Sequence, residues 1–154
     1  MKLSDILKSD FIISNLTGKN KASVLQELID FLKNKNVVND IEGLHNALIE
    51  REKLGSTGIG ENVAIPHAKS GELDQILTLF ARSTEGVDFE SLDQKAVNFV
   101  CLVVAPSNST GHHLKALARI SRLLKNKELR QAILDATSAE EIYSALLEED
   151  SKFI

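Results

Sequence analysis

The nine-residue run Val97–Ala105 constrains the fold most strongly, because only Asn98 interrupts its apolar character. Such a run is typical of a strand buried on both faces, as in the centre of an α/β sheet, and Pro106 ends it. Shorter apolar runs that also favour strands cover residues 11–13, 63–65 and 76–81. The sequence therefore predicts a sheet with at least one central strand.

Amphipathic segments separate and follow these runs. Apolar residues at helical spacing predict helices over 21–35, from Asp40 to Gly55, over 111–125, over 128–134 and from Ser138 onward. Asp40 and Ser138 are suited to cap their helices, and Ser109 or Thr110 to cap the helix over 111–125. We expect one α/β domain over residues 1–154, a sandwich with a mixed sheet of about four to five strands and helices on both faces.

Composition excludes several classes of protein. The net charge is −4 with scattered Lys and Arg, which argues against a nucleic-acid surface. Neither a signal peptide nor a stretch long enough to cross a bilayer is visible, so we expect a cytoplasmic protein without membrane insertion. Cys101 lies within the apolar run and is expected to be a buried small hydrophobic residue rather than a nucleophile.

A glycine-rich segment ends in Pro66-His67. Pro66 has a fixed φ and biases Ile65 towards extended structure, so His67 leaves the short apolar strand at a defined angle. A neutral imidazole is a nucleophile near cellular pH and is also able to leave. Ligand sites of open α/β sheets gather outside strand ends. We therefore interpret His67 as a candidate phosphoryl carrier.

The eighteen residues from Arg51 to Ala68, Arg-Glu-Lys-Leu-Gly-Ser-Thr-Gly-Ile-Gly-Glu-Asn-Val-Ala-Ile-Pro-His-Ala, carry a resemblance to a known family. They resemble the active-site signature of the fructose/mannitol/nitrogen-type EIIA domains of the bacterial phosphoenolpyruvate-dependent phosphotransferase system (PTS). Chain length, order of elements and a second histidine in a later helix also fit. The resemblance implies that His67 receives a phosphoryl group at Nε2 from an HPr-type phosphocarrier protein, with no cofactor.

Further site residues are expected around His67. The guanidinium of Arg51 is suited to bind a phosphoryl group, because a guanidinium donates two parallel hydrogen bonds to phosphate oxygens. The hydroxyls and backbone amides of Ser56, Thr57 and Gly58 form a candidate phosphate-binding loop. The resemblance implies that His113, rather than His112, is the second active-site histidine. It also makes Glu61 a candidate to orient the imidazole.

Alternatives remain open at this point. Zinc held by Glu61, His67 and His113 is disfavoured because these residues form no short metal-binding motif. The resemblance covers both nitrogen-regulatory proteins, which act on regulatory target proteins, and stand-alone sugar-transport components, which pass the phosphoryl group to a cysteine of an EIIB domain. The nitrogen-regulatory type is favoured. Ile59 and Val63 are expected on an apolar docking surface around the site.

Overall fold

The computed structural model describes residues 1–152. Its helices are α1 (Leu3–Ile6), α2 (Lys21–Lys35), α3 (Ile41–Lys53), α4 (Thr110–Leu124), α5 (Lys127–Asp135) and α6 (Ala139–Asp150). Its strands are β1 (Ile12–Ile13), β2 (Gly58–Gly60), β3 (Val63–Ala64), β4 (His67–Ser70), β5 (Leu77–Val87) and β6 (Val97–Pro106). None of the helices in this part of the chain is long and apolar enough to cross a membrane.

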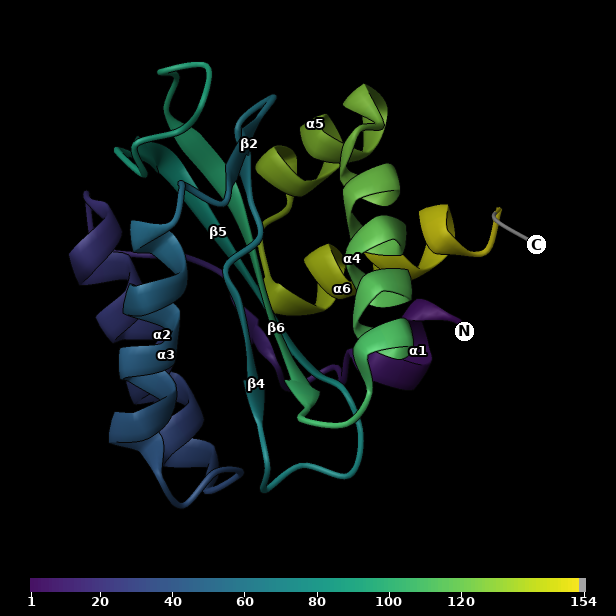
Figure 1. The fold of residues 1–154 in the computed structure, drawn as a ribbon. Coiled ribbons are helices and arrows are strands. Elements are labelled where there is room, and N and C mark those ends of the chain that lie inside the picture. Colours follow the sequence, from purple (N-terminus) through teal and green to yellow (C-terminus); the bar gives the residue numbers. More distant parts are fainter. Residues whose placement is uncertain (153–154) are drawn as a thin grey trace.

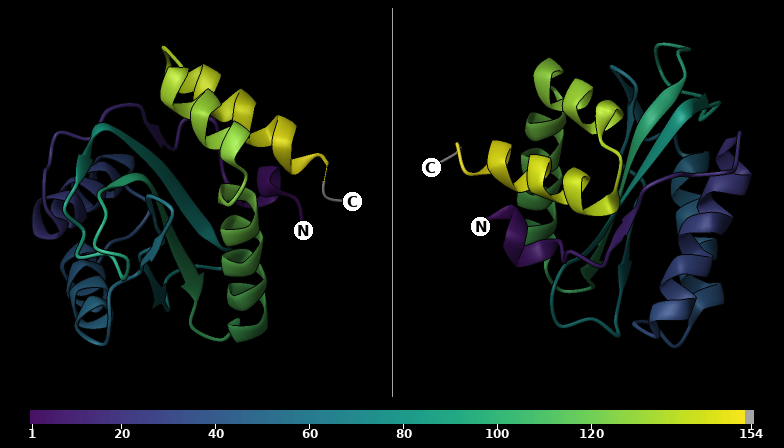
Figure 2. Two further views of the ribbon diagram at one scale, coloured as in Figure 1. Left: turned by 90° about the horizontal axis from the view of Figure 1, so that it is seen from above. Right: turned by 180° about the vertical axis from the view of Figure 1, so that it is seen from behind.

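One mixed sheet forms the middle layer. Its strand order is β1-β5-β6-β3-β2. Strand β4 pairs with β6 as well, further along that strand than β3 does. Strand β6 is antiparallel to β5 and parallel to β3 and β4. Helices α2 and α3 cover one face, and α4, α5 and α6 with the short α1 cover the other (Figures 1 and 2). The α/β sandwich with a mixed sheet and helices on both faces is therefore confirmed.

The apolar run that predicted a central strand forms β6, in which every residue except Asn98 is buried. The side chains of Phe99, Leu102 and Val104 are each at most 1% exposed. Because β6 has neighbours on both edges and helices on both faces, its side chains exclude water on every side. This strand fixes the position of β4, whose first residue His67 pairs with Val103.

Helix ends follow the predicted capping residues with one exception. The side chain of Asp40 accepts a hydrogen bond from the Gly43 amide at 2.9 Å, and that of Ser138 accepts one from the Glu141 amide at 3.1 Å. Ser109 occupies the capping position of α4, but its side chain makes no capping hydrogen bond. The hydroxyl of Thr110 instead contacts a side chain from β4, as described below.

The sheet has six strands, more than the four to five expected, because β2 lies in the glycine-rich segment and β4 in a segment for which no strand was predicted. Strand β4 contains a single apolar residue that is buried, Ala68, so it lacks the alternation that identifies a strand. It forms because its backbone pairs with the buried β6. Strand β5 also extends further than residues 76–81, to Val87.

Candidate active site

His67 lies at the start of β4, half-buried between α3 and α4. Its Nδ1 atom is 2.8 Å from the carbonyl oxygen of Ile65, which accepts hydrogen bonds only. Nδ1 therefore carries the ring hydrogen in the neutral imidazole, and Nε2 carries the lone pair. Pro66 joins Ile65 to His67, and its fixed φ restricts how the Ile65 carbonyl and the His67 ring can lie relative to each other.

Arg51 approaches the same imidazole from the last turn of α3. Its Nε donates to Nε2 of His67 at 3.2 Å, and its Nη1 donates to the carbonyl oxygen of Gly55 at 2.9 Å. The second bond holds the guanidinium at the C-terminal end of α3, where the helix dipole favours a cation. Both contacts on His67 require the tautomer with hydrogen on Nδ1. They place the nucleophilic Nε2 atom next to the permanent positive charge of Arg51.

His113 lies on the other side of His67, in the first turns of α4. The two imidazole centroids are 5.4 Å apart with the rings at 84°, and His113 is 7% exposed. Its Nε2 has no hydrogen-bond partner among the described residues. Burial, together with electrostatic interaction with His67 and Lys69, lowers the pKa of His113 from its usual value, which favours the neutral ring at neutral pH.

The neighbouring histidine, His112, is exposed and lines a shallow depression near the N-terminus with Met1 and Lys8. Of this pair, His113 is the one that lies against His67. His45 is half-buried in α3 and lies outside this cluster.

Donors of the glycine-rich segment are used within the protein. The Ser56 hydroxyl donates to the carbonyl oxygen of Phe89 at 2.9 Å and accepts from the Gly58 amide at 3.1 Å. The Thr57 amide donates to Glu52 at 3.0 Å, and its hydroxyl donates to the same carboxylate. These contacts give Ser56, Thr57 and Gly58 a role in shaping the loop, and leave few free donors for a phosphoryl group.

Glu61 and Asn62 have φ of 54° and 67° and form the tight turn between β2 and β3. The Glu61 carboxylate accepts a hydrogen bond from Arg130 at 3.1 Å. Glu61 was expected to orient the imidazole, but Nδ1 of His67 bonds to the carbonyl oxygen of Ile65. Within the described part of the chain, no three His, Cys, Asp or Glu side chains are grouped as metal ligands would be.

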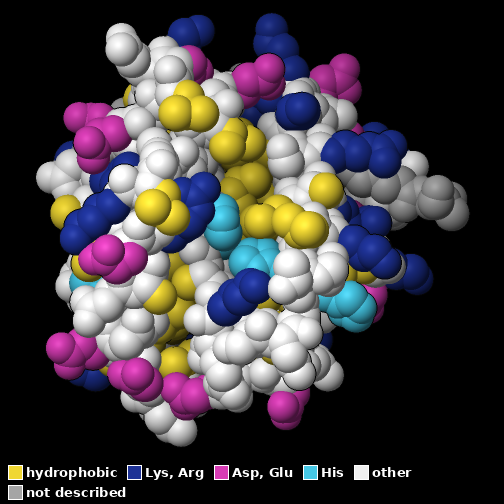
Figure 3. All heavy atoms as spheres, viewed as in Figure 1, with side chains coloured by type: hydrophobic (Ala, Val, Ile, Leu, Met, Phe, Trp, Pro, Cys, Tyr) yellow, Lys and Arg dark blue, Asp and Glu magenta, His cyan; other side chains and the backbone are white. Residues whose placement is uncertain are grey.

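In the surface view, hydrophobic side chains and Lys or Arg side chains border histidines that lie in a hollow near the middle of this face (Figure 3). Three large apolar residues near the site are exposed. Leu54 directly follows α3, Ile59 lies in β2 and Leu114 follows His113; their exposed fractions are 84%, 44% and 63%. Val63 was expected on this surface, but it is 2% exposed because its side chain packs in the hydrophobic core. Ile59 has the expected exposure.

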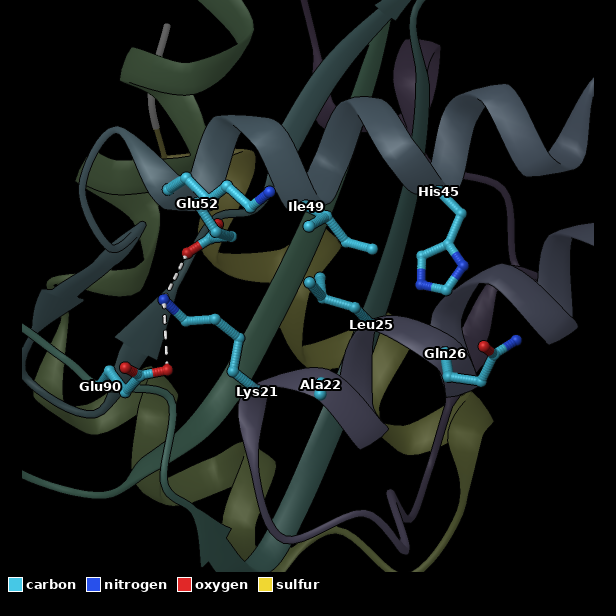
Figure 4. Close-up of a pocket in the computed structure, with 9 residues that line it drawn as sticks. Lys21, Ala22, Leu25, Gln26, His45, Ile49, Glu52 and Glu90 are labelled. Atoms are coloured by element: carbon cyan, nitrogen blue, oxygen red, sulfur yellow. Dashed lines mark ion pairs between the residues drawn. The ribbon is translucent and has the colours of Figure 1, made fainter.

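A separate groove of about 480 Å³ lies between α2 and α3 (Figure 4). Leu25 and Ile49 line its apolar part, and Lys21 lies at one end, 3.0 Å from Glu52 and 3.9 Å from Glu90. Neither His67 nor His113 lines it. Sequence patterns gave no indication that Glu52 is buried, because the ammonium that pairs with its carboxylate belongs to Lys21 in a different helix. Its contact with the Thr57 loop was not predicted either.

Comparison with known proteins identifies the family of the chain. Residues 5–149 match the family described as phosphoenolpyruvate-dependent sugar phosphotransferase system, EIIA 2. A nitrogen regulatory protein of Bradyrhizobium diazoefficiens is 38% identical over 95% of both chains. The fructose-specific EIIABC component of Bacillus subtilis is 36% identical over 97% of this chain, which spans 24% of that protein.

Solved structures share the fold. The nitrogen regulatory protein IIA-Ntr of Neisseria meningitidis superposes with a TM-score of 0.85 at 30% identity, covering 94% of this chain and 98% of that one. The complex of enzyme IIAMTL and phosphorylated enzyme IIBMTL from Escherichia coli shows a likeness of fold alone, with a TM-score of 0.76 at 20% identity over 93% and 99% of the chains. The chain therefore belongs to the EIIA type 2 family of the phosphotransferase system.

Proposed function

We propose that the chain is a phosphocarrier in which Nε2 of His67 accepts a phosphoryl group from the phosphohistidine of an HPr-type protein. The observation that carries the proposal is the pair of contacts on the imidazole: Ile65 accepts the Nδ1 hydrogen, and Arg51 lies at the Nε2 lone pair. An acceptor nitrogen needs an available lone pair and a cation near the incoming charge, and this arrangement supplies both.

The transfer balances without a cofactor. The Nε2 lone pair attacks phosphorus, the bond from phosphorus to the donor imidazole breaks, and its electron pair returns to the donor nitrogen. His67 keeps its Nδ1 hydrogen, so its ring becomes a phosphorylated imidazolium. In the next transfer the P–N bond breaks and neutral imidazole is the leaving group. Arg51 has to leave Nε2 as the P–N bond forms, and its guanidinium then binds phosphoryl oxygens. His113 assists with its Nε2, which has no hydrogen-bond partner within residues 1–152.

Intact-mass spectrometry tests this proposal. The chain is incubated with enzyme I, HPr and phosphoenolpyruvate, and the mass is measured at neutral to alkaline pH, where phosphohistidine persists. We expect one acid-labile phosphoryl group on the wild type and none on His67→Ala, with His45→Ala labelled like the wild type. Label retained by His67→Ala would overturn the assignment.

Nitrogen-type regulation is the form of this function that we favour, because the Bradyrhizobium and Neisseria proteins match over nearly their whole lengths. The second candidate is transfer to a cysteine of a fructose-type EIIB domain, which the match to the Bacillus EIIABC component supports. Mixing the phosphorylated chain with such an EIIB domain separates the two. Rapid movement of the phosphoryl group to the cysteine would favour sugar transport.

A further inference from the structure

Lys69 is a cation of the site that the sequence analysis did not single out. It lies on β4 two residues after His67, and buried Ala68 separates them. Because side chains alternate along a strand, Lys69 and His67 point to the same face. Recognising the segment as a strand would have predicted this placement.

The ammonium of Lys69 bridges the two segments that carry the histidines. Its Nζ donates to Oγ1 of Thr110 at 3.0 Å. Thr110 is the first residue of α4, three positions before His113, and the N-terminus of that helix has no side-chain cap. The positive charge also lies close enough to His113 to lower its pKa. Lys or Arg side chains lie next to the two central histidines in the surface view (Figure 3).

Lys69 also lacks a counterion. The described residues place no carboxylate within ion-pair distance of it, whereas Lys21 has two and Lys35 has one. Its present partner is a neutral hydroxyl on an exposed residue, and such a bond costs little to exchange. An unneutralised ammonium beside two histidines fits a dianionic ligand.

We propose that Lys69 is a second cationic ligand of the phosphoryl group on His67, held by Thr110 while His67 is unphosphorylated. This inference rests on the proposed phosphocarrier function. On phosphorylation, the ammonium exchanges the Thr110 hydroxyl for a phosphoryl oxygen, on the side of the imidazole away from the α3 guanidinium. Lys69 transfers no proton, so the bonds formed and broken are those given above.

The experiment uses potassium phosphoramidate, a small phosphodonor that requires no protein docking. Its P–N bond breaks as the bond to Nε2 forms, and ammonia leaves. Labelling rates are measured by intact mass for wild type, Lys69→Met, Lys69→Arg, Thr110→Val and the exposed control Lys33→Met. We expect Lys69→Met to label about tenfold more slowly, as loss of one charge-assisted hydrogen bond implies. Lys69→Arg restores most of the rate, and Lys33→Met matches the wild type.

Thr110→Val is expected to label at least as fast as wild type, because it frees the ammonium. Equal labelling rates for Lys69→Met and Lys33→Met would overturn the inference about Lys69. The proposed function would still stand in that case, because the wild type is labelled. A defect seen only with phospho-HPr, and not with phosphoramidate, would also overturn it, because Lys69 would then act in protein docking. If neither phosphoramidate nor phospho-HPr labelled the wild type, the proposed function would be wrong, and so would the role of Lys69 that rests on it.

Discussion

Replacement of Glu52 by glutamine tests how the loop before His67 is held. The Glu52 carboxylate is 8% exposed, accepts two hydrogen bonds from Thr57, and lies 3.0 Å from the ammonium of Lys21. Glutamine keeps the shape of the side chain and one acceptor oxygen but removes the charge. The substitution therefore weakens three contacts without leaving a cavity.

The expected loss follows from these contacts. Converting a charge-assisted hydrogen bond into a neutral one costs roughly 1 kcal/mol, and Thr57 makes two. Lys21, with a side chain 14% exposed, loses its near counterion but keeps solvent and Glu90 at 3.9 Å, which adds about 1 kcal/mol rather than the larger cost of a fully buried charge. The free energy of unfolding should fall by about 3 kcal/mol.

Urea unfolding followed by circular dichroism measures this change. With a slope near 1.5 kcal/mol per molar urea, the midpoint should fall by about 2 M. Glu50→Gln is the matched control, since Glu50 pairs with Lys53 on the solvent side of the same helix and should change stability by less than about 0.5 kcal/mol. A Glu52→Gln protein as stable as the Glu50→Gln protein would refute this account of the loop.

Three further predictions concern the core and the site. Arg82 is 4% exposed and donates to the carbonyl oxygens of Ile133 and Ala136, so Arg82→Met should cost about 3 kcal/mol and lower Tm by roughly 10 °C in calorimetry; an unchanged Tm would contradict this. Because the pKa of His113 is lowered in the folded state, the unfolded chain takes up its proton first as pH falls. Wild-type stability should therefore decrease from about pH 7 to about pH 5 more steeply than that of His113→Gln, and equal slopes would count against the lowered pKa. Burial raises the pKa of Cys101 to about 12, so iodoacetamide should label it only when urea unfolds the protein; fast labelling of the native protein would show an accessible thiolate.

Periodicity predicted the elements that depend on apolar burial. The core strand β6 and helices α2 and α3 have patterns that specify their structure locally, and Asp40 caps its helix as expected. Strand β4 and the four-residue α1 carry no such pattern. Strand β4 forms through backbone pairing with β6, and α1 is shorter than two helical turns. Local sequence therefore gave no signal for either.

The same distinction applies to the candidate site. The resemblance selected Arg51, His67 and His113, and the structure brings these three side chains together. It could not predict the partner of Glu61, because Arg130 is 69 positions away and reaches the turn only through the packing of α5. The roles of the Ser56–Gly58 loop were obscured in the same way. The Phe89 carbonyl, 33 positions from Ser56, is brought to the loop by the tertiary fold, whereas Glu52 is only five positions from Thr57.

The central claim is that Nε2 of His67 is the atom that carries the phosphoryl group. It is tested most directly by ¹⁵N and ³¹P NMR of the uniformly ¹⁵N-labelled protein after phosphorylation by enzyme I, HPr and phosphoenolpyruvate. We predict phosphorus bonded to Nε2 of His67, with the hydrogen retained on Nδ1 and held by the Ile65 carbonyl. Phosphorus on Nδ1, on His113 or on no histidine would contradict the account.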